Sequence, residues 1–109
     1  MGVAGNPIIL TGAASGVGDA TARQLIERGH RVISLDIKEP SAAVQAHHHC
    51  DLSDPASIDA TLAKLDGRYG SLLHVAGVTG TVGDEKTIAV NILGLRYLTD
   101  RLWDRVVDG

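Results

Sequence analysis

The clearest signal in this chain is the stretch Thr11-Gly12-Ala13-Ala14-Ser15-Gly16-Val17-Gly18. It separates an apolar, β-branched run at 7–11 from a segment at 17–28 whose apolar residues recur at helical spacing. Glycine at position 12 permits backbone angles closed to other residues, and glycine at position 18 permits close packing of helix on strand. Gly16 lets the main chain approach a ligand, and the amides that begin the helix face an anion there. The stretch therefore predicts a phosphate-binding turn, and the lack of a following Lys excludes a P-loop.

The rest of the chain alternates apolar runs with helical patterns. Gly29 is expected to end the first helix, and further strands are predicted at 31–36, 46–50 and 71–75. Asp54 and Pro55 mark the start of a second helix that Gly67 ends, and a long amphipathic helix is predicted from 84 to about 107. This alternation predicts an α/β fold with helices on both faces of a Rossmann-type parallel sheet, in strand order 3-2-1-4.

Length and composition limit the possible functions. The chain has 109 residues, 44% of them hydrophobic, which fits one domain with a core of Ala, Val, Ile and Leu, since Phe is absent. A net charge of −3 argues against nucleic-acid and anionic-membrane partners. A single cysteine, Cys50, excludes an intrachain disulfide. With no basic leader and no apolar run of about 18 residues, we expect a soluble cytoplasmic protein.

Asp36 is the second candidate site residue. It ends the predicted second strand, 18 residues after Gly18, close to the spacing of about 20 expected for a ribose-binding acid. A carboxylate there accepts from both ribose hydroxyls and repels a 2′-phosphate. Because Ile37 follows it and the turn has no basic residue, NAD is favoured over NADP, although Lys38 weakens this preference. The alternative is a solvated acid at a strand end.

Together these residues resemble the short-chain dehydrogenase/reductase family. Its pattern Thr-Gly-x-x-x-Gly-x-Gly is matched from Thr11 to Gly18, and Asp51-Leu52 is similar to its acidic and apolar pair after the third strand. Val75-Ala76-Gly77 resembles its Asn-Ala-Gly segment, and the run from Val90 to Gly94 resembles its Val-Asn-x-x-Gly. The matches extend from about 7 to 105 and are most similar in style to bacterial 3α-hydroxysteroid dehydrogenase/carbonyl reductase.

The resemblance implies an oxidoreductase that transfers hydride between NAD and a small secondary alcohol or carbonyl compound. Asn91 would support a proton-relay water, and no residue is assigned to a metal. The implied cofactor-binding residues are Gly12, Ser15, Gly16, Val17, Gly18, Asp36, Ile37, Asp51, Leu52, Ala76 and Gly77.

Two departures from the family pattern matter. The family's catalytic Ser and Tyr-x-x-x-Lys follow the Asn helix, so this chain is expected to be the cofactor-binding half and to be inactive as given. Tyr97 and Arg101 have the right spacing for a substitute, but Arg stays protonated and cannot replace Lys. His74-Val75 stands where the family has Asn-Asn, which predicts looser hydrogen bonding at that strand end.

Other patterns allow different interpretations. His47, His48, His49 and Cys50 suggest a metal site, but alternate side chains of a strand point to opposite faces, so an exposed edge strand is favoured. The apolar arc of the long helix, which includes Trp103, is wider than one sheet contact needs, and the family uses this helix between subunits. We therefore expect a homo-oligomer. A stand-alone, non-catalytic nucleotide-binding or interaction module is the alternative to an enzyme fragment.

Overall fold

The computed structural model describes residues 5–14, 16–65, 67–75 and 93–106. They form a four-stranded parallel sheet in the order β3-β2-β1-β4, which confirms the predicted topology. The strands are β1 (Ile8–Thr11), β2 (Val32–Asp36), β3 (Ala46–His49) and β4 (Ser71–His74). Each lies within one residue of its predicted bounds at either end, because the apolar runs mark the buried part of each strand.

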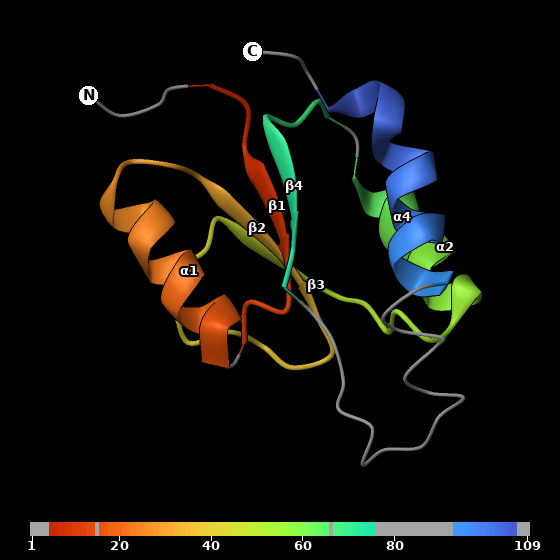
Figure 1. Cartoon of the computed structure of the whole chain (residues 1–109), viewed down its shortest axis with the longest axis horizontal. Helices are drawn as coiled ribbons and strands as arrows, with labels where there is room; N and C mark the ends of the chain where they lie inside the picture. Colours follow the sequence, from red (N-terminus) through yellow and green to blue (C-terminus); the bar gives the residue numbers. More distant parts are fainter. Residues whose placement is uncertain (1–4, 15, 66, 76–92, 107–109) are drawn as a thin grey trace.

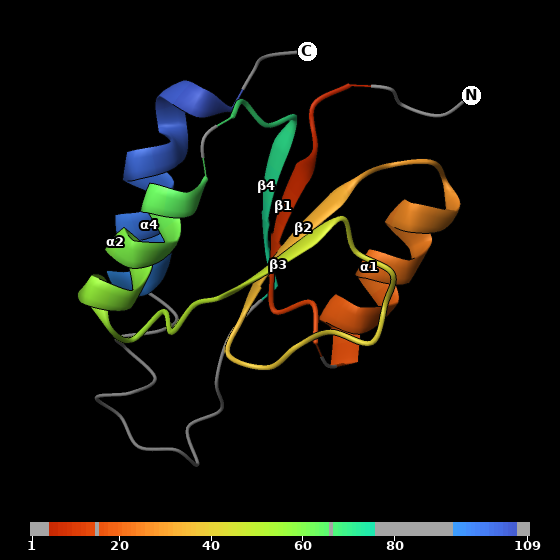
Figure 2. The ribbon, with the colours of Figure 1, turned by 180° about the vertical axis from the view of Figure 1, so that it is seen from behind.

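Helices cover both faces of this sheet. Helix α1 (Gly16–Glu27) lies on one face, and α2 (Pro55–Lys64) and α4 (Leu95–Leu102) lie side by side on the other (Figures 1 and 2). The alternation along β1 explains the two layers: Ile9 packs into the core under α2 and α4, while Leu10 packs into the core that includes Ala22 of α1. The core is built mainly from aliphatic side chains, as the composition predicts, but Cys50 and Tyr69 are also buried in it.

The ends of α1 and α2 are set by local residues. Gly29 has φ 89°, its amide donates to Ile26 O at 3.0 Å, and the amide of His30 donates to Leu25 O at 3.0 Å. This is a Schellman motif and confirms Gly29 as the residue that ends α1. Asp54 caps α2 by accepting from the Ala56 amide at 3.0 Å. The end predicted for α2 was wrong, because the helix stops at Lys64, before Gly67.

The last helix is shorter than predicted at its carboxyl end. Helix α4 stops at Leu102, a 3₁₀ turn follows at Trp103–Arg105, and Val106 forms a bridge with Tyr69. The amide of Tyr69 donates to Arg105 O at 2.8 Å, and the Arg105 side chain donates to the carbonyls of Gly67 and Leu65. These contacts with the segment before β4 draw the chain out of the helix. The predicted helical residues 84–92 lie outside the described part of the chain.

No helix in the described part of the chain combines the length and the apolar character that crossing a membrane requires.

Candidate functional site

The glycine turn joins the end of β1 to the start of α1. Gly12 has φ 80° and Gly16 has φ 56°, both in the left-handed region that favours glycine. A Cβ on Gly18 would lie 1.6 Å from the carbonyl oxygen of Gly12, so the helix can pack this closely only with glycine there. A Cβ on Gly16 would meet nothing within 4 Å. The turn therefore has a tightly packed side at Gly18 and an open side at Gly16; Ser15 lies outside the described residues.

The start of α1 provides the electrostatics of this turn. The first amides of a helix have no carbonyl partner within the helix, and the helix dipole places partial positive charge beside them. Val17, in this first turn, is 72% exposed. An anion can therefore approach the open side of the turn, and the missing side chain of Gly16 leaves room for it.

Asp36 ends β2, as predicted, and lies beside the glycine turn. Its Oδ2 accepts from the Ala14 amide at 3.1 Å, and its Oδ1 accepts from the Lys38 amide at 2.9 Å. The half-buried carboxylate therefore ties the turn to the end of β2. Each carboxylate oxygen can accept a second hydrogen bond, so these contacts orient the group without exhausting it. Ile37, the next residue, is 52% exposed.

Asp51 and Leu52 follow β3, the neighbour of β2. The two strand ends are joined because the Cys50 amide donates to Asp36 O at 3.1 Å. Asp51 Oδ1 accepts from the amide and the hydroxyl of Ser53, at 2.9 and 2.6 Å. The side chain of Leu52 is buried in the core under α2 and α4, so a ligand would meet its backbone. Ala76, Gly77 and Asn91 lie outside the described residues.

The carboxyl end of β4 differs from the prediction. His74 Nδ1 lies 3.3 Å from Thr11 Oγ1, and His74 Nε2 lies 3.0 Å from Thr99 Oγ1. The Val75 amide also donates to Thr11 O at 3.2 Å. The expectation of looser hydrogen bonding was therefore wrong, because the imidazole reaches both a strand and a helix. Burial lowers the pKa of His74. Sequence reasoning missed Thr11 and Thr99 as its partners, which no local pattern marks.

Tyr97 and Arg101 form a surface cluster with α2. The Tyr97 hydroxyl donates to Asp59 at 2.8 Å, and this hydrogen bond raises the pKa of Tyr97. The Arg101 guanidinium lies 3.3 Å from the centre of the Tyr97 ring, with its Nε 3.9 Å from Asp59. Both side chains are therefore engaged with Asp59 and with each other on the surface, and the rejection of this pair as a catalytic substitute stays a prediction.

The histidine-rich strand β3 lies at the edge of the sheet, as predicted. His47 Nδ1 is 3.1 Å from Ser34 Oγ of β2, and burial lowers the pKa of His48. Burial raises the pKa of the Cys50 thiol. Among the residues described here, no group of three or more His, Cys, Asp or Glu could hold a metal ion.

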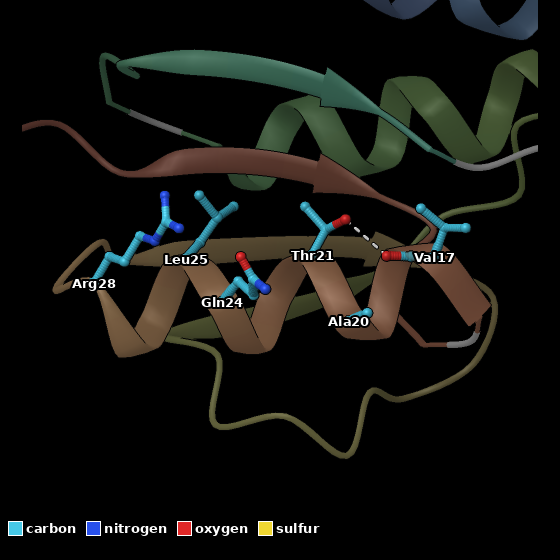
Figure 3. A pocket seen from close by; sticks show the side chains of 6 residues that line it. All are labelled: Val17, Ala20, Thr21, Gln24, Leu25 and Arg28. Atoms are coloured by element: carbon cyan, nitrogen blue, oxygen red, sulfur yellow. Dashed lines mark hydrogen bonds between the residues drawn. The ribbon is translucent and has the colours of Figure 1, made fainter.

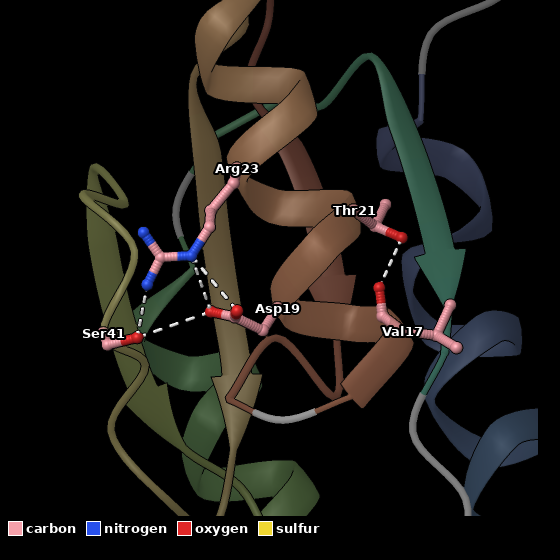
Figure 4. Close-up of polar contacts among 5 residues, drawn as sticks. All are labelled: Val17, Asp19, Thr21, Arg23 and Ser41. Atoms are coloured by element: carbon pink, nitrogen blue, oxygen red, sulfur yellow. Dashed lines mark hydrogen bonds and ion pairs between the residues drawn. The ribbon is translucent and has the colours of Figure 1, made fainter.

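A hollow and a cluster of polar contacts lie along α1. A hollow of about 330 Å³ runs along this helix (Figure 3), lined by Val17, Ala20, Thr21, Gln24, Leu25 and Arg28. Of the predicted site residues that the structure describes, only Val17 lines this hollow. In Figure 4, Arg23 pairs with Asp19 at 3.1 Å and donates to Ser41 at 2.6 Å. These contacts hold the loop after β2 against α1.

A parallel sheet in this order, with a glycine turn after β1 and an acid ending β2, is the arrangement of Rossmann-type α/β proteins. The sequence model described as short chain dehydrogenase matches residues 6–108. Coniferyl-alcohol dehydrogenase of a Pseudomonas species is 38% identical over 109 residues, covering 100% of this chain and 43% of that protein. The chain therefore belongs to the short-chain dehydrogenase/reductase family.

Solved structures agree with this assignment. A protein from Mycobacterium paratuberculosis matches with a TM-score of 0.83 at 30% identity, over 98% of this chain and 45% of that one. RhlG of Pseudomonas aeruginosa, solved with NADP, matches with a TM-score of 0.78 at 25% identity, over 95% of this chain and 47% of that one. The chain thus spans less than half the length of these relatives.

Proposed function

We propose that residues 1–109 act as a single NAD-binding unit of a short-chain oxidoreductase. The observation that carries the proposal is the glycine turn, where a Cβ on Gly18 would lie 1.6 Å from Gly12 O while a Cβ on Gly16 would meet nothing within 4 Å. In this proposal the open space at Gly16 receives a pyrophosphate, next to the amides of the first turn of α1. Family membership and the NADP complex of RhlG support a dinucleotide as the ligand.

Each predicted site residue has a part in this proposal. The turn, with Ser15 and Val17, would hold the pyrophosphate, and Asp36 with Ile37 would contact the adenosine ribose. Asp51 and Leu52, after the neighbouring strand, would contact the adenine. Further along the chain, Ala76 and Gly77 would line the cofactor, and Asn91 would support a proton-relay water.

Asp36 supports NAD rather than NADP. Its carboxylate is fixed by two backbone amides, so its negative charge stays where a 2′-phosphate would have to lie. Arg23 of α1 is paired with Asp19. RhlG makes NADP the competing hypothesis, and the exposed Lys38 is the residue of this chain that favours it.

Bound NAD supplies the hydride chemistry of the proposed reaction, which interconverts a secondary alcohol and a carbonyl compound. The 109 residues contain no Tyr-x-x-x-Lys, and the Tyr97 hydroxyl donates a hydrogen bond to Asp59 on the surface. We therefore propose that this chain alone binds NAD without turnover. Oxidation of a secondary alcohol by purified chain 1–109 with NAD would contradict this proposal.

The exposed apolar surface supports self-association, as part of the same proposal. Trp103 is 73% exposed and Leu93 is 59% exposed, just beyond the two ends of α4, and β4 is an outer strand of the sheet that the described residues form. We expect light scattering at micromolar concentration to give a mass at least twice the 11.4 kDa of one chain. A mass of one chain would contradict self-association and would leave cofactor binding unaffected. The proposed location is the cytoplasm.

A titration with NADH tests the binding site. Asp36→Ala should weaken NADH binding by about tenfold or more, because a charged hydrogen bond is lost. Asp54→Ala is the matched control, since this acid also accepts a backbone amide but caps α2. The control should bind NADH within about twofold of wild type. A folded wild-type chain that shows no saturable binding would overturn the proposal.

A further inference from the structure

His74 lies at the point where the order of this sheet reverses. The chain goes from β1 to β2 on one side and, after β3, returns to β4 on the other side of β1. In sheets of this kind, a ligand lies outside the carboxyl ends of the two strands that flank this point. Those strands are β1 and β4, and their last residues, Thr11 and His74, are register partners.

The imidazole of His74, at the end of β4, connects this strand to β1 and to α4. Its Nδ1 lies 3.3 Å from Thr11 Oγ1 on β1, and its Nε2 lies 3.0 Å from Thr99 Oγ1 on α4. Thr11 is fully buried and directly precedes Gly12, the first residue of the glycine turn. One side chain therefore links the residue directly before the glycine turn to α4.

The position of the proton follows from Thr99. Its hydroxyl carries one hydrogen and donates it to Leu95 O at 2.7 Å, since a carbonyl can only accept. Thr99 Oγ1 must therefore accept from His74, which requires a hydrogen on Nε2. In the neutral ring, Nδ1 is then an acceptor, and the Thr11 hydroxyl can donate to it. Burial of the ring, which lowers its pKa, agrees with the neutral form.

We propose that neutral, Nε2-protonated His74 is a positioning residue of the dinucleotide site, which holds the glycine turn and α4 at a fixed separation. This inference rests on the proposed function and extends it to a residue that the family's Asn-Asn segment does not predict. His74 acts through Thr11 and Thr99, and it contacts no part of the cofactor in this account.

The first test compares NADH affinities of variants of the whole chain. His74→Leu removes both hydrogen bonds and should weaken binding by about tenfold, whereas His74→Gln, which keeps a donor and an acceptor, should stay within about threefold. Thr99→Val should weaken binding in the same direction, and Thr99→Ser should not. The double variant His74→Leu, Thr99→Val should bind NADH as weakly as His74→Leu alone, because His74→Leu already removes the hydrogen bond to Thr99.

The second test reads the proton directly. Long-range ¹H–¹⁵N NMR of the histidine side chains at pH 8 should show His74 as the Nε2–H tautomer in wild type. Thr99→Val should shift the His74 signals, and Thr99→Ser should preserve them. If His74→Leu fails to fold, Thr99→Val and Thr99→Ser still test the role of His74. They remove or keep the acceptor of its hydrogen bond and leave His74 itself unchanged.

The outcomes separate this inference from the function on which it rests. An Nδ1–H tautomer, or equal NADH affinity in wild type and His74→Leu, overturns the role of His74 while NAD binding stands. A folded wild-type chain that binds no NADH overturns both. Weak binding by His74→Leu, with rescue by His74→Gln and the expected tautomer, supports the inference.

Discussion

β1 and β4 lie next to each other and end at register partners, yet their carboxyl ends are held by different means. After β1, the chain relies on glycine, whose backbone angles and missing side chain allow the turn to pack against α1. At the end of β4, a single side chain, His74, makes hydrogen bonds to β1 and α4. The end of β1 therefore depends on the absence of side chains, and the end of β4 depends on the side chain of His74.

The largest effect is expected at the glycine side. Gly18→Ala would place a Cβ 1.6 Å from Gly12 O, so the backbone itself must move. We expect the free energy of unfolding to fall by about 3 kcal/mol or more, at the upper end of overpacking effects. Urea denaturation measures this, with Gly67→Ala as control, where the nearest atom is 3.8 Å away. Equal stability of the two variants would show that the turn is not tightly packed at Gly18.

Changes at the end of β4, where His74 makes its hydrogen bonds, should lower the free energy of unfolding by less than Gly18→Ala does. Thr99→Val keeps the shape of the side chain but leaves the Nε2–H of His74 without its acceptor. We expect the free energy of unfolding to fall by about 1–2 kcal/mol, less than the full cost of a buried unsatisfied donor, because the hydrogen bond is only part-buried. Thr99→Ser should retain most of the stability in the same urea experiment. If both variants are as stable as wild type, the link through His74 does not hold this strand end.

Gly16 tests the open part of the turn. Gly16→Ala meets no atom within 4 Å but has to adopt φ 56°, so it should cost about 1–2 kcal/mol of unfolding free energy. Gly16→Asn should recover part of that stability, since Asn tolerates left-handed angles. Both variants should bind NADH more weakly than wild type, because a side chain would occupy the open space proposed for the pyrophosphate. Tight NADH binding by Gly16→Asn would place the pyrophosphate elsewhere.

The smallest expected effect is a dependence of stability on pH. The pKa of His74 lies below the ordinary histidine value of 6.5 in the folded chain, so the unfolded chain binds the proton more readily. The stability from neutral His74 is present above pH 6.5 and is lost as pH falls below it. We expect a loss of less than about 1 kcal/mol, because the ring is partly exposed and water screens it.

Denaturation at pH 7.5 and pH 5.5 measures this loss. His48, whose pKa is also lowered, contributes in the same direction, so His74→Gln should reduce the pH dependence without removing it. An unchanged dependence in His74→Gln would show that His74 does not titrate as described.

The two strand ends also differ in what the sequence could predict. The glycine turn, Asp36 and the cap at Asp54 follow from local rules, because backbone angles and strand lengths depend on residues close in sequence. The link from Thr11 to His74 joins residues 63 apart, and His74 and Thr99 are 25 apart. The early end of α4 likewise depends on Arg105 and Tyr69, which meet only in the folded chain. Hydrogen bonds between residues far apart in the chain leave no periodic pattern in the sequence from which they could be predicted.

We propose that the open side of the glycine turn binds a dinucleotide. Mapping backbone amide shifts by ¹H–¹⁵N NMR, while NADH is added to the isotope-labelled chain, tests this binding most directly. We expect saturable shifts concentrated at residues 12–18 and at Asp36, with little change along the outer part of α2. Shifts confined to the hollow around Gln24 and Arg28, or no shifts in a folded chain, would contradict it.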